Sequence, residues 1–359
     1  MKTTILALFL TAFPCLALSS SARADGESEF LVFLSADNLE RRSVMEPALQ
    51  ASDFTPTLDL LYSYNKGSWR ALGEYLLTDD ESELERLQIG YEFSPETTIW
   101  FGRYHQPVSA WNHQFHHGAY LQPSISHPSI ENWEDDGGVI PAHIAGFMLD
   151  SMQSFRKNEG LRYVASYGFA PILVGGELRP FDVLDPGEGA SRPAASLNLS
   201  YYPDIVGETN VGLIAGYAEI EAPPDPVLGN VSTLEIRQKL LGAQANLEGE
   251  KWSMIGVAYY VDNKSHGSII VVNDWFAAGY LQLQRKLSQN TSVFARIERT
   301  DNERADYLAL FSDYIDRRDM IGFRWDFAKR QALAVEISEN RLLSDDFSEA
   351  RVQWSAVLP

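Results

Sequence analysis

The chain has 359 residues and a formal net charge of −20 at pH 7, which argues against a nucleic-acid partner. Its single cysteine excludes a disulfide framework and thiolate metal clusters. Beyond the first 25 residues no apolar run reaches the roughly 18 residues of a transmembrane helix, which leaves a soluble protein or a β-barrel in a membrane. The Tyr, Phe and Trp content of 12% favours the barrel.

The first 24 residues have the features of a secretory signal peptide. Lys2 precedes the apolar core ILALFLTAFPCLAL, and Ala22-Arg23-Ala24 forms a cleavage signal before Asp25. Removal of this segment would also remove Cys15. No internal repeat or linker indicates a second domain, so the prediction is a signal peptide at residues 1–24 and a single β-barrel domain at residues 25–359.

Segments in which apolar and polar residues alternate run through the rest of the chain. The clearest is Ile321–Phe327, with apolar side chains on one face and Arg324 and Asp326 on the other. This period of two is that of a β-strand, although a β-sandwich would show it as well. It predicts sixteen strands, at residues 28–36, 55–65, 68–78, 84–94, 97–105, 139–153, 160–178, 194–203, 208–221, 231–248, 251–263, 272–287, 290–301, 318–328, 330–341 and 345–358.

The connections between the predicted strands alternate in length. Short turns such as Lys66-Gly67 and Ala328-Lys329 separate mostly longer loops. An even number of strands with short turns at one end is the pattern of bacterial outer-membrane barrels, and a sandwich has no reason to show it. Residues 160–178 are interpreted as one strand with a bulge near Pro171, because a split there would break this parity.

The longest connection is also the richest in polar side chains. Residues 103–143 contain six of the seven histidines, together with four prolines and the pair Gly137-Gly138. These prolines and glycines exclude one continuous helix or strand. The segment is therefore predicted to be a long loop carried by a β scaffold.

Signal peptide, sixteen alternating strands, a long loop after the fifth strand and an amphipathic last strand together resemble a Gram-negative outer-membrane porin. The resemblance implies an all-β, transmembrane antiparallel barrel in the cell outer membrane, surrounded by lipid, and it suggests a homotrimer. It also implies that the third outer loop, here Gln106–Gly138, folds into the lumen as the constriction. Porins usually end in phenylalanine, whereas this chain ends Leu358-Pro359. Phosphate selectivity is not carried over, because the chain is acidic.

Charged side chains within spanning strands are expected to face the lumen, because a lipid-facing Arg or Lys costs about 2–4 kcal/mol at the bilayer midplane. The predicted pore wall consists of Arg70, Arg86, Arg103, Arg162, Arg296, Arg324 and Arg351. The predicted constriction loop presents His113, His116, His117, Glu131, Glu134, Asp135 and Asp136. Opposed charges of this kind would filter solutes by charge. The alternative is that the arginines only pair with lumen carboxylates and hold the barrel.

Three loop histidines have a spacing that converges on one metal ion if the segment is helical, namely His113, His116 and His117. A divalent metal is the one cofactor considered, and the alternative is that these histidines hydrogen-bond the loop. Some outer-membrane barrels are phospholipases with catalytic His, Ser and Asn. No such arrangement stands out around Ser124, Ser126 and Ser129, so enzymatic activity is not expected.

The sequence thus predicts a porin-type channel for passive diffusion of small hydrophilic or ionic solutes. The alternative function is an outer-membrane barrel whose His-rich loop binds or imports divalent metal ions. A third class, an adhesin or assembly scaffold, would concentrate its sequence interest in the outer loops. Loops such as 222–230 and 302–317 are ordinary surface connections, which disfavours that class.

Overall fold

The computed structural model describes residues 26–43, 50–79, 82–108, 111, 115, 118–134, 137–156, 158–181, 183, 192–224, 232–266, 271–342 and 345–359. The predicted signal peptide lies outside the described residues. So do five residues of the predicted constriction loop, His113, His116, His117, Asp135 and Asp136. The roles proposed for these segments stay predictions.

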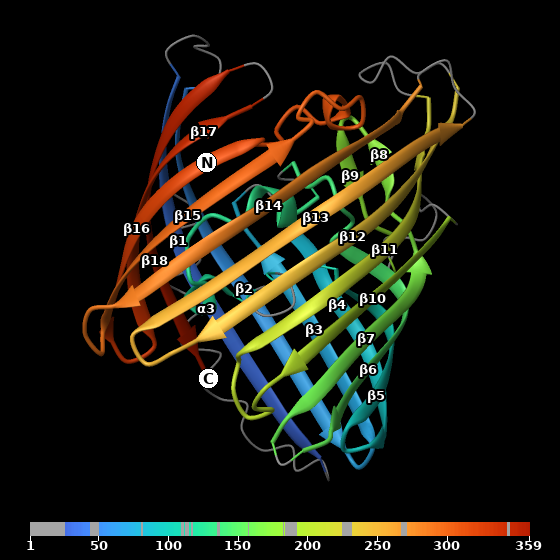
Figure 1. Cartoon of the computed structure of the whole chain (residues 1–359). Helices are drawn as coiled ribbons and strands as arrows, with labels where there is room; N and C mark the ends of the chain where they lie inside the picture. Colours follow the sequence, from blue (N-terminus) through green and yellow to red (C-terminus); the bar gives the residue numbers. More distant parts are fainter. Residues whose placement is uncertain are drawn as a thin grey trace.

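Sixteen antiparallel strands form a closed barrel (Figure 1). Each pairs with its neighbours in chain order, and β1 closes the ring by pairing with β18, where Phe33 lies opposite Val357. With the small hairpin β8–β9, the strands are β1 Glu27–Ser43, β2 Ala51–Lys66, β3 Trp69–Leu77, β4 Ser82–Ser94, β5 Thr97–His105, β6 His143–Ser154, β7 Gly160–Phe169, β8 Ile172–Val174, β9 Glu177–Arg179, β10 Pro193–Tyr202, β11 Asn210–Ala222, β12 Leu234–Glu248, β13 Trp252–His266, β14 Asn273–Lys286, β15 Thr291–Asp301, β16 Arg317–Ala328, β17 Gln331–Arg341 and β18 Asp346–Leu358.

The prediction of a sixteen-stranded barrel is confirmed, whereas the single strand predicted at 160–178 is wrong. β7 ends at Phe169, and the hairpin β8–β9 follows. Pro171 lacks the N–H that would continue the ladder, and Gly175-Gly176 form the hairpin turn with φ of +66° and +88°. Because β7 pairs directly with β10, the hairpin belongs to the loop and leaves the parity of the barrel unchanged.

The outer surface of the barrel is apolar. Large side chains on strands all around the ring are exposed, among them Phe54, Ile89, Phe147, Leu213 and Ile321. Exposure to water would be unfavourable by roughly 25 cal/mol per Å², whereas such a belt matches the hydrocarbon core of a bilayer. Among the described residues, no helix is long and apolar enough to cross a membrane. The position of the apolar belt on the strands identifies them as the membrane-spanning elements.

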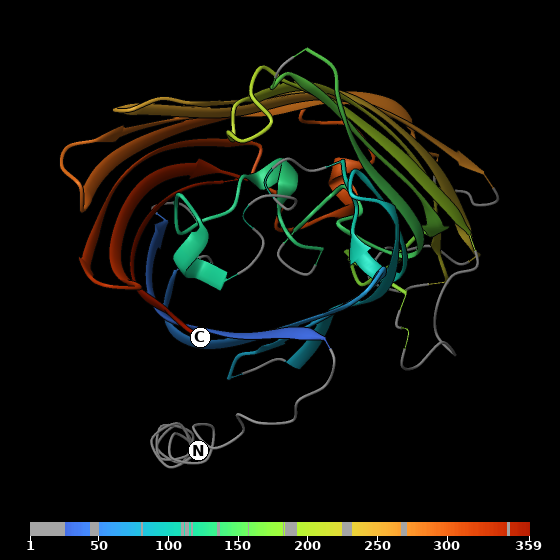
Figure 2. The same cartoon turned by 90° about the horizontal axis from the view of Figure 1, so that it is seen from below.

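The described residues of the loop between β5 and β6 (106–142) lie in the lumen, as predicted for Gln106–Gly138 (Figure 2). It contains α3 (Gly118–Leu121) and the 3-10 turn η3 (Ser129–Glu131). The strand predicted to start at residue 139 starts instead at His143, so Val139 and Ile140 belong to the loop, where both are buried.

A hydrophobic cluster fills one side of the lumen. Inward side chains of β11–β14 pack there against the loop, the hairpin β8–β9 and the connection 302–316, which contains η5 (Leu308–Leu310). Trp111, Leu173, Ile236 and Tyr307 are almost completely buried in it. Close packing of this kind leaves no room for a solute, and the larger open space of the lumen lies on the opposite side, against β1–β4 and β18.

Candidate functional site

Two cavities occupy the part of the lumen that the hydrophobic cluster leaves open. The outer cavity, about 640 Å³, is walled mainly by β1–β4 and β18 and extends toward the long loops. The inner cavity, about 410 Å³, lies nearer the short turns, between β12–β14 and β16. Gly118 and Ala119 line the outer cavity, and Tyr120 and Leu121 line the inner one. α3 therefore borders both cavities.

The segment 118–122, which we call the crossbar, is held by β2 and β16, which stand four places apart in the ring of strands. The N–H of Gly118 donates to Asp59 Oδ2 of β2 at 3.1 Å. On the other side, Arg324 of β16 donates to the carbonyl oxygens of Tyr120 (2.8 Å) and Gln122 (2.9 Å). The Arg324 guanidinium also lies over the Tyr120 ring, 5.1 Å from its centroid. These contacts fix the crossbar against the part of the wall that runs from β16 through β18 and β1 to β2.

Arg296 of β15 holds the next part of the loop. Its guanidinium is completely buried and pairs with Glu298 Oε1 at 2.8 Å. The Nη1 atom donates to Ser124 Oγ and to the Ser126 carbonyl oxygen, each at 2.9 Å, and Nη2 donates to the His127 carbonyl oxygen at 3.1 Å. A buried charge is tolerated when it is paired and hydrogen-bonded in this way, and the planar fork of donors fixes the loop backbone.

Two wall carboxylates bind the loop from the same side. Glu298 Oε2 accepts hydrogen bonds from the N–H and the hydroxyl of Ser129, both at 2.6 Å. Glu336 of β17 accepts from the N–H of Ser126 at 3.0 Å and from its hydroxyl at 2.9 Å. Charge-assisted bonds of this type are the stronger ones in proteins. The loop serines are thus engaged as anchors, and the expectation of no enzymatic activity stays a prediction.

The two described acidic residues of the predicted constriction loop, Glu131 and Glu134, are buried and line neither cavity. Glu131 Oε2 accepts hydrogen bonds from the N–H of Trp111 (2.9 Å) and the hydroxyl of Tyr280 (3.0 Å). Glu134 Oε1 accepts from the N–H of His143 at 2.8 Å. Both carboxylates fasten the loop, and a role for them in charge filtering stays a prediction.

His127 lies at the centre of the loop, stacked on Trp133 with ring centroids 5.1 Å apart. Burial and the positive charges of nearby arginines, Arg296 first among them, lower the pKa of His127 to about 3. The ring is therefore neutral at neutral pH. Gln122 Nε2, an amide donor, lies 2.9 Å from His127 Nε2, which accepts the hydrogen bond in the neutral ring.

All seven predicted pore-wall arginines are hydrogen-bonded or paired. Arg296 and Arg324 bind the loop, as described above. The other pairs are Arg70 with Glu92, Arg86 with Glu74 (2.7 Å), Arg103 with Glu83, Arg162 with Asp150 (2.6 Å) and Arg351 with Asp37 (3.2 Å). Arg324 lines the inner cavity and Arg351 the outer one. This pairing agrees with the alternative explanation given for the arginines, in which they pair with lumen carboxylates and hold the barrel. The role of the arginines in charge filtering stays a prediction.

The outer cavity has a mainly acidic lining, which the sequence prediction did not anticipate because it weighed only the arginines. Among the described lining residues, seven carboxylates face three arginines, with Asp37, Asp53, Asp59, Glu74, Glu85, Asp313 and Glu349 against Arg41, Arg318 and Arg351. The signal was present in the alternation of 53–59, where Asp53 and Asp59 share one face with two threonines. Such an excess of acidic side chains makes the local potential more negative.

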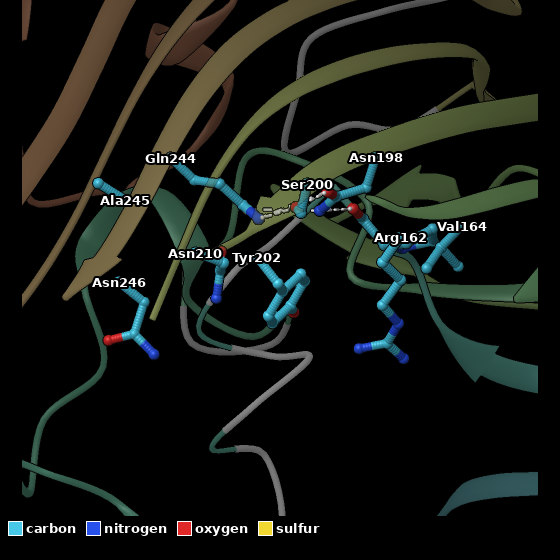
Figure 3. A pocket seen from close by; sticks show the side chains of 10 residues that line it. Arg162, Val164, Asn198, Ser200, Tyr202, Asn210, Gln244, Ala245 and Asn246 are labelled. Atoms are coloured by element: carbon cyan, nitrogen blue, oxygen red, sulfur yellow. Dashed lines mark hydrogen bonds between the residues drawn. The ribbon is translucent and has the colours of Figure 1, made fainter. Parts of the chain in front are cut away.

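A third, small pocket lies on the inner wall where β7, β10, β11 and β12 meet (Figure 3). Its volume is about 20 Å³, enough for a single water molecule. Asn198 donates to the Pro107 carbonyl oxygen at 3.0 Å and accepts from the Ser200 hydroxyl at 2.8 Å, and Gln244 donates to Ser200 at 2.9 Å. This ladder holds the start of the loop against the wall and is too small for a solute.

The closed barrel, its apolar belt and its loop-filled lumen define a class of structure, the sixteen-stranded outer-membrane β-barrels, and the predicted porin-type fold is confirmed. In particular, the chain is similar to outer-membrane expressed OmpT of Vibrio cholerae, with a TM-score of 0.59 and 11% identity over 94% of this chain and 99% of that one. It is also similar to the outer membrane channel DcaP of Acinetobacter baumannii, with a TM-score of 0.57 and 11% identity over 93% and 99%.

A further likeness is to OmpF of Salmonella typhi, solved in complex with daunomycin, with a TM-score of 0.58 and 12% identity over 93% of this chain and 98% of that one. At these identities the likeness is one of fold. No protein-family model and no curated protein sequence matches the chain.

Proposed function

We propose that the protein is a porin-type channel in the outer membrane of a Gram-negative bacterium. It passes small hydrophilic solutes by passive diffusion, and it prefers cations. The observation that carries the proposal is the outer cavity of about 640 Å³, whose described lining holds seven carboxylates and three arginines. The structural neighbour DcaP is titled an outer membrane channel, which supports the channel part of the proposal.

The cation preference follows from how the three lining arginines are engaged. Arg41 Nη2 lies 2.7 Å from Glu349 Oε1, and Arg351 Nη1 lies 3.2 Å from Asp37 Oδ2. The third arginine, Arg318, lies 3.1 Å from Glu298 Oε1. Paired charges largely cancel at a distance, so other lining carboxylates, Asp53 and Asp313 among them, set the sign of the potential. In a narrow cavity with low-dielectric walls, such a potential raises the local concentration of cations.

The proposed site of solute selection is the passage at the crossbar. There the outer cavity meets Gly118 and Gln122, and the crossbar separates it from the inner cavity. The homotrimer suggested by the porin resemblance stays a prediction, and one solved form of Vibrio cholerae OmpT is titled a trimer. Chemical crosslinking of the purified protein, followed by denaturing electrophoresis, checks that assembly.

The test of the channel is conductance of the refolded protein in a planar bilayer under a KCl gradient. We expect steady steps and a reversal potential that indicates preference for K⁺. Asp53→Asn removes one lining charge and is expected to shift the reversal potential toward zero. Asp204→Asn is the matched control, because Asp204 lies in a short turn outside both cavities and, like Asp53, accepts one hydrogen bond from nearby backbone.

Absence of conductance from the folded barrel would contradict the channel. Anion preference, or equal shifts in the two variants, would contradict the assignment of selectivity to the outer cavity.

A further inference from the structure

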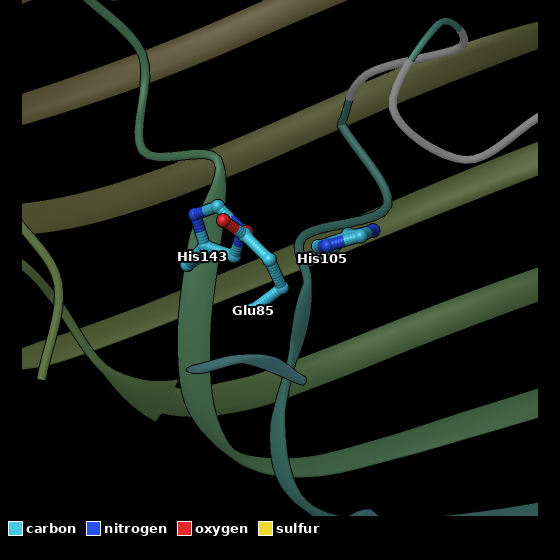
Figure 4. Close-up of side chains that lie close together, drawn as sticks. All are labelled: Glu85, His105 and His143. Atoms are coloured by element: carbon cyan, nitrogen blue, oxygen red, sulfur yellow. The ribbon is translucent and has the colours of Figure 1, made fainter. Parts of the chain in front are cut away.

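Three potential metal ligands converge at the base of the loop, from three neighbouring strands. His105 ends β5 and pairs directly with His143, which begins β6. Their rings pack edge to face with centroids 4.9 Å apart. Glu85 of β4 approaches His143, with Oε2 2.9 Å from Nε2. The three ligand atoms lie within 4.8 Å of one another, and all three side chains are buried (Figure 4).

Glu85 reaches this position because β4 is irregular there. Glu74 of β3 pairs with Arg86, but the next residue, Tyr75, pairs with Leu84. Glu85 is therefore the extra residue of a β-bulge, and Glu85 and Arg86 are both buried although they are adjacent in the strand. Bulges re-aim side chains and are frequent beside functional sites. Here the bulge directs a carboxylate at an imidazole.

His143 is held in the orientation that a metal ligand requires. Its Nδ1 lies 2.7 Å from Glu134 Oε2, while the other oxygen of Glu134 accepts the backbone N–H groups of Ala142 and His143. A carboxylate fixed in this way keeps the proton on Nδ1 and leaves Nε2 facing Glu85. Histidines that bind metals usually donate their second ring N–H to such a partner.

We propose that Glu85, His105 and His143 bind one divalent transition-metal ion of the Zn²⁺ type, with Glu134 as the outer-sphere partner. Two imidazoles and one carboxylate are an established ligand set for Zn²⁺, with water in the fourth position. Ligand atoms of a tetrahedral Zn²⁺ site lie roughly 3.4 Å apart. The two ligand atoms that are farthest apart here would therefore move closer to each other by up to about 1.4 Å when the ion binds. Glu85 also lines the outer cavity, which provides an entry path.

A metal ion at this place joins the two ends of the loop to each other and to the neighbouring strand. His105 and His143 immediately flank residues 106–142, and Glu85 belongs to β4. The ion would therefore stabilise the base of the segment that narrows the lumen. This inference goes beyond the channel function and does not rest on it, because binding is measured without conductance.

The first measurement uses the wild-type barrel, refolded and freed of metal with a chelator. Titration with Co²⁺ reports the ligands directly, because tetrahedral Co²⁺ absorbs visible light far more strongly than octahedral Co²⁺. We expect one saturable site with the tetrahedral spectrum, displaced by Zn²⁺. Absence of a saturable site, or an octahedral spectrum alone, would overturn the proposal and leave His143 as a buried ion-pair partner of two glutamates.

The second measurement assigns the site by calorimetric Zn²⁺ titration of variants. His105→Gln is expected to weaken binding more than about 100-fold, and Glu134→Gln about 10–100-fold, as for outer-sphere partners of other metal sites. The control His266→Gln alters an exposed histidine at the end of β13 and should leave binding unchanged. Retained tight binding in His105→Gln would overturn the assignment.

A triple variant in which His113, His116 and His117 become glutamine separates this site from the metal site predicted on the loop. We expect the triple variant to bind Zn²⁺ as the wild type does. Loss of the single tight site in that variant, together with its retention in His105→Gln, would place the metal on the loop instead and overturn the present proposal.

Discussion

Replacement of Gly118 by alanine tests whether the crossbar has a single position in the lumen. The φ of Gly118 is +54°, a left-handed conformation that costs other residues about 1–2 kcal/mol. A Cβ atom there would also lie 2.1 Å from Cγ of Phe33 on β1, so that the ring or the crossbar must move. Overpacking of this kind costs about 1–3 kcal/mol. Together these effects lower the unfolding free energy by about 2–5 kcal/mol.

Gly67, in the turn between β2 and β3, provides the matched control. Its φ is +58°, and a Cβ atom there would have no neighbour within 4 Å. Gly67→Ala should therefore cost only the conformational part, about 1–2 kcal/mol. In the double variant Gly118→Ala/Phe33→Ala the ring is absent, so the loss should fall below the sum of the two single losses by about 1–3 kcal/mol, the overpacking energy.

The assay combines denaturant unfolding in detergent micelles, followed by tryptophan fluorescence, with single-channel conductance. We expect Gly118→Ala to be less stable than Gly67→Ala and to be the only one of the two that changes conductance. Equal losses of stability, with conductance unchanged in both variants, would refute the idea that Phe33 and the crossbar share one fixed arrangement.

Three further changes probe the anchoring of the loop. Arg324→Gln removes two charge-assisted hydrogen bonds to loop carbonyls and should weaken that anchor by about 1–3 kcal/mol, which should make the single-channel current noisier. The control Arg70→Gln, at the short-turn end, should leave the current steady. Equal noise in the two variants would contradict the idea that Arg324 holds the crossbar in place. The pKa of His127 is about 3 in the folded protein, whereas that of a histidine released from the fold is about 6.5. Between about pH 3 and pH 6.5 the released loop therefore binds more protons than the folded one, and the unfolding free energy falls as the pH drops from about 6.5 toward 3. His127→Gln should remove this part of the pH dependence of unfolding, and an unaltered pH profile would contradict the burial of a neutral ring. Glu131→Gln replaces a charged acceptor by a neutral one and should lower the unfolding free energy by about 1–3 kcal/mol; an unchanged denaturation midpoint would argue against its role as an anchor.

The strands were predictable because lipid and lumen impose opposite preferences on alternate residues. The alternation at 321–327 therefore located β16 to within a few residues. The alternation of apolar and polar residues is lost where a segment packs against other parts of the protein and faces neither lipid nor open water. Val139 and Ile140 belong to the loop although they look like the start of a strand, because they pack into the hydrophobic cluster rather than against lipid.

The site was less predictable because its contacts depend on register and on the path of the loop. The position of Arg296 on the lumen face followed from alternation, but its burial under the loop did not. His105 and His143 stand at the ends of the long loop, and the pairing of antiparallel strands would have brought them together. The third ligand, Glu85, depends on a bulge, and a bulge shifts the alternation without a clear mark in the sequence.

The hydrophobic cluster and the outer cavity are built from different stretches of the chain. Among the described residues, the hydrophobic cluster draws only on the stretch from Tyr104 to Tyr314. The wall of the outer cavity comes mainly from residues 33–85 and 313–353, the two ends of the chain. The hydrophobic cluster can therefore be completed within one continuous stretch of polypeptide, whereas the outer cavity is complete only when β1 meets β18. Closure of the barrel and completion of the outer cavity are thus the same event.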